Sequence, residues 1–267
     1  MPEGDMIQNP PDAATLARLK CAYDQASEII GPGAECFDVA ELVERIRWRW
    51  RPDKVRVVLL AESHGWTSRD EMKSRVRQPD GTETCFARFV YCLGCGEPQL
   101  VSPCVERNRT NISLQFWKLL HDTVCGPTVP YTWLTEKNCQ ERVGNKFDLL
   151  RKMRAAGVWL VDASITALFR KLEKLEKVKK DYRSVLKACW TSHVREVLYG
   201  CEPSAVVIVG KDVYDAIGGD VRKALGGSIK IDYIYQPQAH LSKQARDDDR
   251  RKCFELCRLA ANPCRRC

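Results

Sequence analysis

"VRVVLLAESHGWTS", residues 55–68, is the stretch that decides the fold. Its first seven residues are apolar apart from Arg56 and rich in valine, as in a short strand buried on both faces. The run ends at Glu62, and His64 follows two residues later, so a carboxylate and an imidazole come at the carboxyl end of the strand. In open α/β sheets that end is where ligands bind.

Three later segments, 158–164, 205–210 and 228–238, carry similar strand-like runs, and helical spacing fills most of the chain around them. Strands that alternate with helices predict a parallel, doubly wound sheet. We therefore expect an α/β fold in a single domain, with an open, mainly parallel four-stranded sheet flanked by helices. Gly157 stands where the C-cap of the helix before the second strand belongs.

The domain should span residues 11–250. A flexible N-terminal arm at 1–10 would precede it, and the end of a C-terminal helix with a Cys-rich tail at 251–267 would follow. Residues 65–110 show no regular spacing, and a loop of that length is usually functional. In "RIRWRWR", residues 45–51, we favour tryptophans packed inward with solvated arginines over base stacking by the tryptophans.

Charge and hydropathy restrict the partners. Lys and Arg number 43 against 35 Asp and Glu, and the net charge of +8 favours an anionic partner such as nucleic acid. The start of the sequence lacks a signal-peptide pattern, and no apolar run reaches the roughly 20 residues of a membrane span. We expect a cytoplasmic monomer with no membrane association, used at the nucleoid in a bacterium or in the nucleus of a eukaryote.

The sequence has fourteen cysteines. Without an export signal, reduced thiols are the default. Metal-like spacings occur at Cys92–Cys95, with Cys85 and Cys104 nearby, at Cys253–Cys257 and at Cys264–Cys267, but no matched pair of knuckles repeats. We expect no metal and no cofactor, and a zinc-dependent interaction protein stays an alternative.

Several common enzyme classes lack their signatures. No G-x-G-x-x-G follows the first strand, and Gly210-Lys211 lacks the rest of a phosphate-binding P-loop. The sequence has no H-E-x-x-H zinc motif and no G-x-S-x-G nucleophile elbow. A nucleotide-dependent dehydrogenase, a P-loop NTPase and a typical serine hydrolase are therefore not indicated.

Polar residues at three strand ends resemble the motifs of the uracil-DNA glycosylase superfamily. "AESHG" at 61–65 is similar to its G-E-x-P-G motif, with Glu62 in the glutamate position. "LVDASIT" at 160–166 resembles L-L-N-x-x-L-T, with Asp162 in place of the base-reading asparagine, and "QPQAHLS" at 236–242 is a degenerate H-P-S-P-x-S. The resemblance covers roughly residues 55–245, and no single motif is intact. It implies a divergent branch, similar to the broad-specificity bacterial enzymes.

The resemblance implies excision of uracil, and of other deaminated bases, from DNA at the start of base excision repair. Glu62 would stabilise the positive charge that develops on the sugar and orient a water, while His64 or His240 would assist the departing base. The base, flipped out of the stack, and the DNA would contact two sets of residues. The base-binding set is Asp162, Ser63, Phe89, Tyr91 and Gln236, and the DNA-binding set is Leu241, Ser242, Lys243 and Arg246.

Two of these assignments have consequences that can be tested. An ionised Asp162 only accepts hydrogen bonds, whereas asparagine both donates and accepts, so we expect the enzyme to accept more bases than uracil. Phe89 and Tyr91 would stack on the base, although core packing is the commoner fate of such residues. A non-catalytic nucleic-acid or nucleotide-binding module of the same fold is the main alternative to the enzyme.

Overall fold

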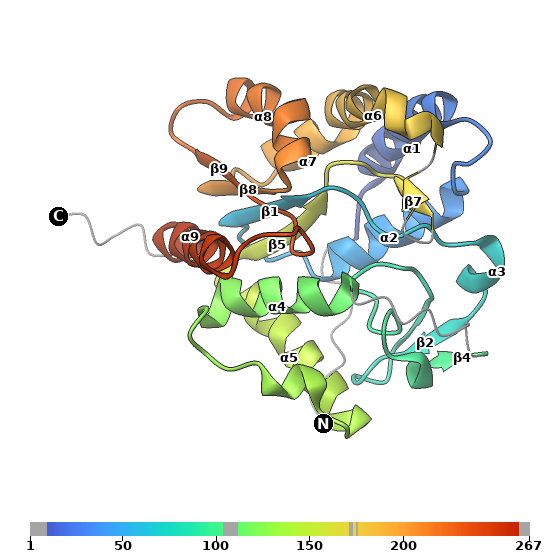
Figure 1. Ribbon diagram of the computed structural model, residues 1–267. Helices are drawn as coiled ribbons and strands as arrows, with labels where there is room; N and C mark the ends of the chain where they lie inside the picture. Colours follow the sequence, from blue (N-terminus) through green and yellow to red (C-terminus); the bar gives the residue numbers. More distant parts are fainter. Residues whose placement is uncertain (1–9, 104–111, 171–172, 175, 262–267) are drawn as a thin grey trace.

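A four-stranded, all-parallel sheet forms the centre of the computed structural model, which describes residues 10–103, 112–170, 173–174 and 176–261. Its strands are β1 (Val57–Ala61), β5 (Val158–Asp162), β8 (Ala205–Val209) and β9 (Lys230–Ile234). They lie side by side in the order β5-β1-β8-β9 (Figure 1). The expected α/β fold with a four-stranded parallel sheet flanked by helices is confirmed at this level.

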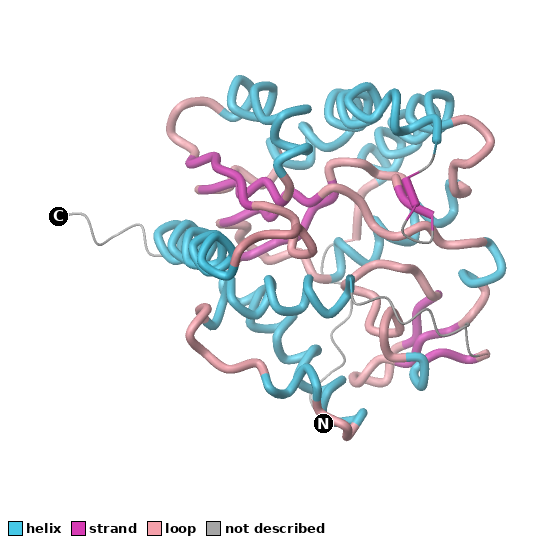
Figure 2. Tube along the Cα trace, viewed as in Figure 1, coloured by secondary structure: helices cyan, strands magenta, loops and turns pink. Residues whose placement is uncertain are grey.

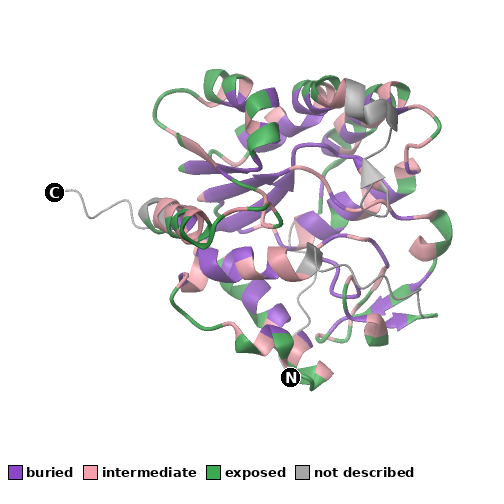
Figure 3. Cartoon of the chain, viewed as in Figure 1, coloured by how far each residue is buried: buried purple, intermediate pink, exposed green. Residues whose placement is uncertain are grey.

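Strands β1, β5 and β8 are buried along their whole length, as their continuous apolar sequences predict. In the register, Val57 of β1 lies opposite Val158 of β5 and Ala205 of β8. Edge strand β9 is more exposed, with a buried residue only at Ile234. Figure 3 shows the buried sheet between partly exposed helices. The sheet is therefore the core of the fold, and its carboxyl edge is held rigidly.

Helices cover both faces of the sheet (Figures 1 and 2). On one face lie α1 (Ala13–Ile30), α6 (Glu176–Cys189), α7 (Arg195–Tyr199) and α8 (Lys211–Leu225), with a π-helical turn at Trp190–Val194 between α6 and α7. On the other face lie α4 (Ile112–Cys125), α5 (Cys139–Ala156) and α9 (Lys243–Ala261). Helix α2 (Phe37–Arg49) packs against α1. Helix α9 passes residue 250 without a break.

Local sequence signals explain where α1 begins and where α5 ends. Asp12 accepts a hydrogen bond from the Thr15 amide and so caps α1. Gly157 ends α5 in the left-handed conformation, at φ 77°. A Cβ there would lie 2.8 Å from the Lys54 carbonyl oxygen, so both the backbone angle and the space require glycine. The predicted C-cap is confirmed. The N-cap residue of α2 is Cys36, and Asp38 lies in the first turn of the helix.

The segment expected to be irregular, 65–110, contains regular structure in its described part. Helix α3 (Arg69–Met72) is followed by a small antiparallel sheet of β2 (Arg75–Arg77), β3 (Glu83–Cys85) and β4 (Val101–Ser102), with a 3₁₀ turn at Pro98–Leu100. Strands this short give no alternating pattern to read. The strand-like run 89–97 consists of turns, with Phe89, Tyr91 and Leu93 buried. Two further small elements are a 3₁₀ turn at Thr132–Thr135 and the hairpin of β6 (Phe169–Arg170) and β7 (Glu173–Lys174).

Among the described residues, no helix has the length and apolarity to cross a membrane. The expected N-terminal arm and the tail cysteines Cys264 and Cys267 lie outside the described residues, as does Cys104.

Candidate functional site

The order of the strands identifies where a ligand crevice is expected. From β1 the chain passes to β5 on one side and then returns to β8 on the other side of β1. The strand order therefore reverses between β1 and β8, and ligands of open α/β sheets bind beyond the carboxyl ends of the strands at such a point. Glu62 directly follows β1, and Gly210 directly follows β8.

Glu62 is half-buried and held by a tyrosine. Its Oε1 accepts a hydrogen bond of 2.5 Å from the Tyr182 hydroxyl on α6. Burial first, and then the negative charge of Glu62, raise the pKa of Tyr182 well above its usual value, so this hydroxyl keeps its proton and donates. The backbone of Glu62 is also fixed, because its carbonyl oxygen accepts from the Ser164 amide at 2.9 Å.

The neighbouring strand end is closed by a glutamine. Gly210 has φ 120°, and its amide donates to the Ile234 carbonyl oxygen at 2.7 Å. A Cβ on Gly210 would lie 2.9 Å from Nε2 of Gln236, so glycine lets the Gln236 side chain lie directly over the end of β8. Gln236, expected to contact the base, is thereby brought to the strand end next to β1.

His64 lies behind this edge in a buried network of charged side chains. Its Nε2 lies 2.5 Å from Oε1 of Glu35, and its Nδ1 lies 3.3 Å from Oδ2 of Asp162. The same Asp162 oxygen accepts from Nη2 of Arg47 at 2.9 Å. Arg47 pairs in turn with Glu44. We call Glu35, His64, Asp162, Arg47 and Glu44 the buried charge network.

The network shifts the titration of its members. Burial alone would lower the pKa of His64, but the charge of Glu35 and hydrogen bonds to Asp162 and Glu35 outweigh it and raise the pKa to about 9. Burial would raise the pKa of Glu44, but the charges of Arg47 and His193 lower it to about 2. At neutral pH the imidazole of His64 is therefore a cation between two carboxyl groups.

This network differs from two expectations. Arg47 was expected in solvent, but only 2% of it is exposed, because Asp162 and Glu44 supply the partners that a buried guanidinium requires. Asp162 was expected to read the base, and only 2% of it is exposed. Its base-reading role stays a prediction, and it would require the carboxylate to exchange a buried ion pair for a base.

Phe89 and Tyr91 are core residues in this structure. Their rings lie 5.3 Å apart, and the guanidinium of Arg47 lies 5.4 Å from the centre of the Phe89 ring. The Tyr91 hydroxyl accepts from the Leu160 amide on β5. Ser63 is half-buried, and its hydroxyl accepts from the Leu168 amide. Stacking on a base by Phe89 or Tyr91 stays a prediction.

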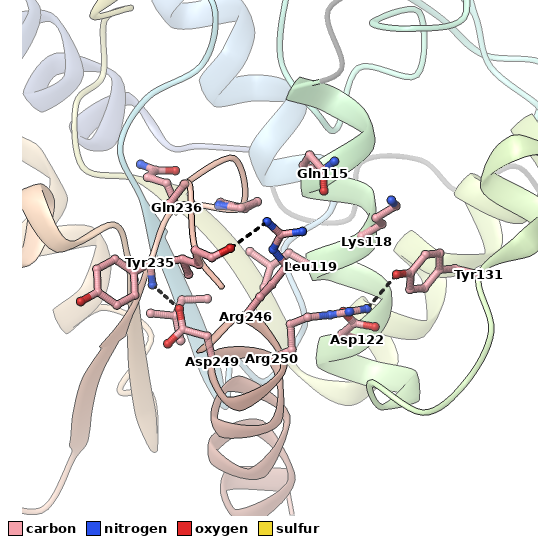
Figure 4. Close-up of a pocket in the computed structure, with 14 residues that line it drawn as sticks. Gln115, Lys118, Leu119, Asp122, Tyr131, Tyr235, Gln236, Arg246, Asp249 and Arg250 are labelled. Atoms are coloured by element: carbon pink, nitrogen blue, oxygen red, sulfur yellow. Dashed lines mark hydrogen bonds and ion pairs between the residues drawn. The ribbon is translucent and has the colours of Figure 1, made fainter. Parts of the chain in front are cut away.

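The remaining expected residues follow β9. His240 is exposed. Ser242 directly precedes α9 and accepts from the Ala245 amide, and Lys243 is exposed in the first turn. Leu241 and Arg246 line a pocket between α4 and α9 (Figure 4). The structure thus brings Glu62 and Gln236 to neighbouring strand ends and keeps His64 and Asp162 beneath that edge.

Cysteines take no part in a metal site in the described ranges, where no three His, Cys, Asp or Glu residues are grouped to hold an ion. Cys92, Cys253 and Cys257 are buried free thiols. Burial raises the pKa of the Cys92 thiol to about 12, which disfavours the thiolate that metal binding needs.

Comparison of the chain with protein-family models, with curated proteins and with solved structures finds no match.

Three residues of the site were missed in the sequence, although one of them had a usable signal. Tyr182 lies in a segment that looks like a basic surface ridge, yet the spacing of Tyr182, Val185 and Cys189 is that of a helix face turned inward. Glu35 lies in the turn between two helices, where a carboxylate ordinarily meets solvent. Gly210 could have been found, because a glycine between a strand and a helix often marks a close approach.

Proposed function

We propose that this chain is a DNA glycosylase of the uracil-excising type, which hydrolyses the N-glycosidic bond of a flipped-out base and so begins base excision repair. The observation that carries the proposal is the Glu62 carboxylate, half-buried at the carboxyl end of β1, where the strand order reverses, with its Oε1 bound by Tyr182. The resemblance of the three strand-end motifs supplies the reaction.

Glu62 carries the central chemical step in this proposal. As the glycosidic bond breaks, the sugar gains positive charge, and a fixed carboxylate stabilises that charge more than a mobile one because no reorganisation is needed. Tyr182 and the Ser164 amide fix the side chain and backbone of Glu62, respectively. The same carboxylate would orient the attacking water.

The departing base carries negative charge and needs a donor. Gln236 is our candidate for this donor, because its side-chain amide nitrogen lies over Gly210 at the neighbouring strand end. His240 lies four residues further along and is exposed, and it is the second candidate for this donor. His64 is fully buried with both ring nitrogens engaged, so we assign it a positioning role beneath the edge.

Basic residues near the same edge suit a DNA backbone. Lys211 begins α8 after β8, and Lys243 and Arg246 lie in the first turn of α9 after β9. All three are exposed. Contacts of this kind set affinity without reading sequence and weaken as salt rises.

The test is base excision from an oligonucleotide with one uracil, in EDTA, followed by alkali to cut the strand at abasic sites. Scission at the uracil position, with none in a matched thymine oligonucleotide, supports the proposal. Zinc in the purified protein, found by metal analysis, without scission would point to the zinc-dependent interaction protein. Retarded migration of the oligonucleotide without scission would favour the non-catalytic nucleic-acid-binding module and exclude the enzyme.

A further inference from the structure

A pocket beside the proposed catalytic edge, with which it shares Gln236, lies between α4, α9 and the segment that follows β9 (Figure 4). Its volume is about 130 Å³. The pocket is lined by apolar side chains, from Leu119, Ile234 and Pro237, and by the aromatic rings of Tyr131 and Tyr235. A cavity of about 150 Å³ holds one benzene molecule, so this pocket suits one six-membered ring. We call it the α4–α9 pocket.

Cations surround the α4–α9 pocket. Arg250 donates to the Asp122 carboxylate and to the Tyr131 hydroxyl, as Figure 4 shows for Tyr131. Lys118 and Arg246 also line the pocket, and in the described ranges neither has a carboxylate within ion-pair distance. Nζ of Lys118 lies 5.2 Å from the centre of the Tyr131 ring. Among the described residues, the lining thus has two cations without an ion pair, Lys118 and Arg246, against one further carboxylate, Asp249, so its net charge still favours an anion.

Two residues that line the pocket have buried side-chain oxygens that accept no hydrogen bond from the described residues. Asp122 is fully buried, Arg250 occupies its Oδ2, and its Oδ1 has no hydrogen-bond partner among the residues described. Nδ1 of His121 lies 3.6 Å from that oxygen, and burial lowers the pKa of His121, so this imidazole is no fixed cation. Oε1 of Gln236 is likewise buried and without a donor in that part of the chain. A buried acceptor left unpaired costs roughly 1–3 kcal/mol, which a ligand N–H would recover.

We propose that the α4–α9 pocket binds a pyrimidine nucleotide, with the base inside and the phosphate at Lys118 and Arg246. A pyrimidine fits the volume, and the single ring N–H of thymine or uracil, at N3, can donate to the buried oxygen of Asp122 or of Gln236. The phosphate complements the two cations. The site lies next to β9, which β8 separates from β1 and Glu62, so the inference does not depend on glycosylase activity. The nucleotide can be free or part of a DNA strand.

Calorimetry with thymidine 5′-monophosphate tests the proposal, because thymine lies outside the proposed substrates. We expect it to bind at least about ten-fold more tightly than thymidine, inorganic phosphate or deoxyadenosine 5′-monophosphate, since each comparator lacks at least one of three features: the single ring, its N–H and the phosphate. Equal binding of phosphate or of the purine nucleotide would overturn it. Oligothymidylate is the second arm: if it alone binds, the nucleotide comes from a strand. Binding of neither refutes the site.

Charge variants then locate the binding. Lys118→Ala and Arg246→Ala should each weaken binding about ten-fold or more, as loss of one charge-assisted contact predicts. Arg251→Ala is the matched control, because Arg251 is an exposed arginine on the same helix that does not line the pocket. Unchanged binding in both pocket variants would refute the location. Glu62→Gln should bind thymidine 5′-monophosphate as the natural chain does, so loss of excision and loss of this site are distinguishable.

Discussion

Nε2 of His64 lies 2.5 Å from Oε1 of Glu35, and both side chains are completely buried. Glu35 also accepts from the amides of Ala167 and Thr67. One carboxylate therefore joins the turn between α1 and α2 to the segments that follow β1 and β5. Because Glu62 lies two residues before His64, this contact helps to hold the proposed catalytic carboxylate at the edge of the sheet.

Replacement of His64 by glutamine should remove a pH-dependent part of the stability. The folded chain raises the pKa of His64 from 6.5 to about 9, so it binds the proton more tightly than the unfolded chain does. That stabilisation is fully present below pH 6.5 and is lost as the pH rises through about 9. It amounts to on the order of 3 kcal/mol.

Urea denaturation of the natural chain and of His64→Gln between these pH values measures the effect. The free energy of unfolding of the natural chain should fall with pH, and that of the variant should fall less. His240→Gln, at an exposed histidine, is the control and should keep the slope of the natural chain. Equal slopes for all three proteins would show that His64 is not charged in the folded state.

Glu62→Gln should lower uracil excision by about 2 to 4 orders of magnitude, the range of general acid–base and electrostatic contributions. The amide keeps the shape of the side chain and removes the charge that stabilises the sugar. Rates under single-turnover conditions measure the effect, and Glu83→Gln, at an exposed glutamate on β3, is the control. A folded Glu62→Gln protein with normal rates would exclude Glu62 from the mechanism.

Tyr182→Phe tests whether the tyrosine positions Glu62. Loss of the donor should reduce kcat about ten- to a hundred-fold with little change in KM, because the hydroxyl touches the carboxylate and not the DNA. Loss of the hydroxyl should also move the acid limb of the pH–rate profile to higher pH, because the hydrogen bond from Tyr182 favours the ionised form of Glu62. A merely structural role would lower stability and leave the profile in place. Tyr199→Phe, whose hydroxyl contacts a backbone carbonyl at Ala224, is the control.

The sequence was sufficient for the α/β class and for the four-stranded parallel sheet. Continuous valine-rich runs identify buried strands because burial on both faces favours apolar residues throughout, and Gly157 identifies a helix end because only glycine adopts its backbone angle cheaply. Arg47 and Glu35 could not be placed. A charged residue is usually exposed, and the partners that bury Arg47 lie both 3 and 115 residues away in the chain. Tyr182 lies 120 residues from Glu62, so only the packing of α6 brings them together.

Asp162→Asn tests whether Asp162 stabilises the fold, reads the base, or does both. As part of the buried charge network, its carboxylate meets Arg47 at 2.9 Å and His64 at 3.3 Å, and neutralising it leaves two buried cations short of a partner. The free energy of unfolding should therefore fall by about 3 kcal/mol or more. Asp148→Asn, at an exposed aspartate on α5, should cost less than about 1 kcal/mol.

If Asp162 also reads the base, asparagine should narrow excision toward uracil and away from hypoxanthine and xanthine, because it restores a donor as well as an acceptor. Rates on the three oligonucleotides, measured at a temperature where the variant is fully folded, decide the matter. Lower stability with unchanged relative rates would assign Asp162 to the fold alone, and a narrowed preference would show that the buried pair opens to the substrate.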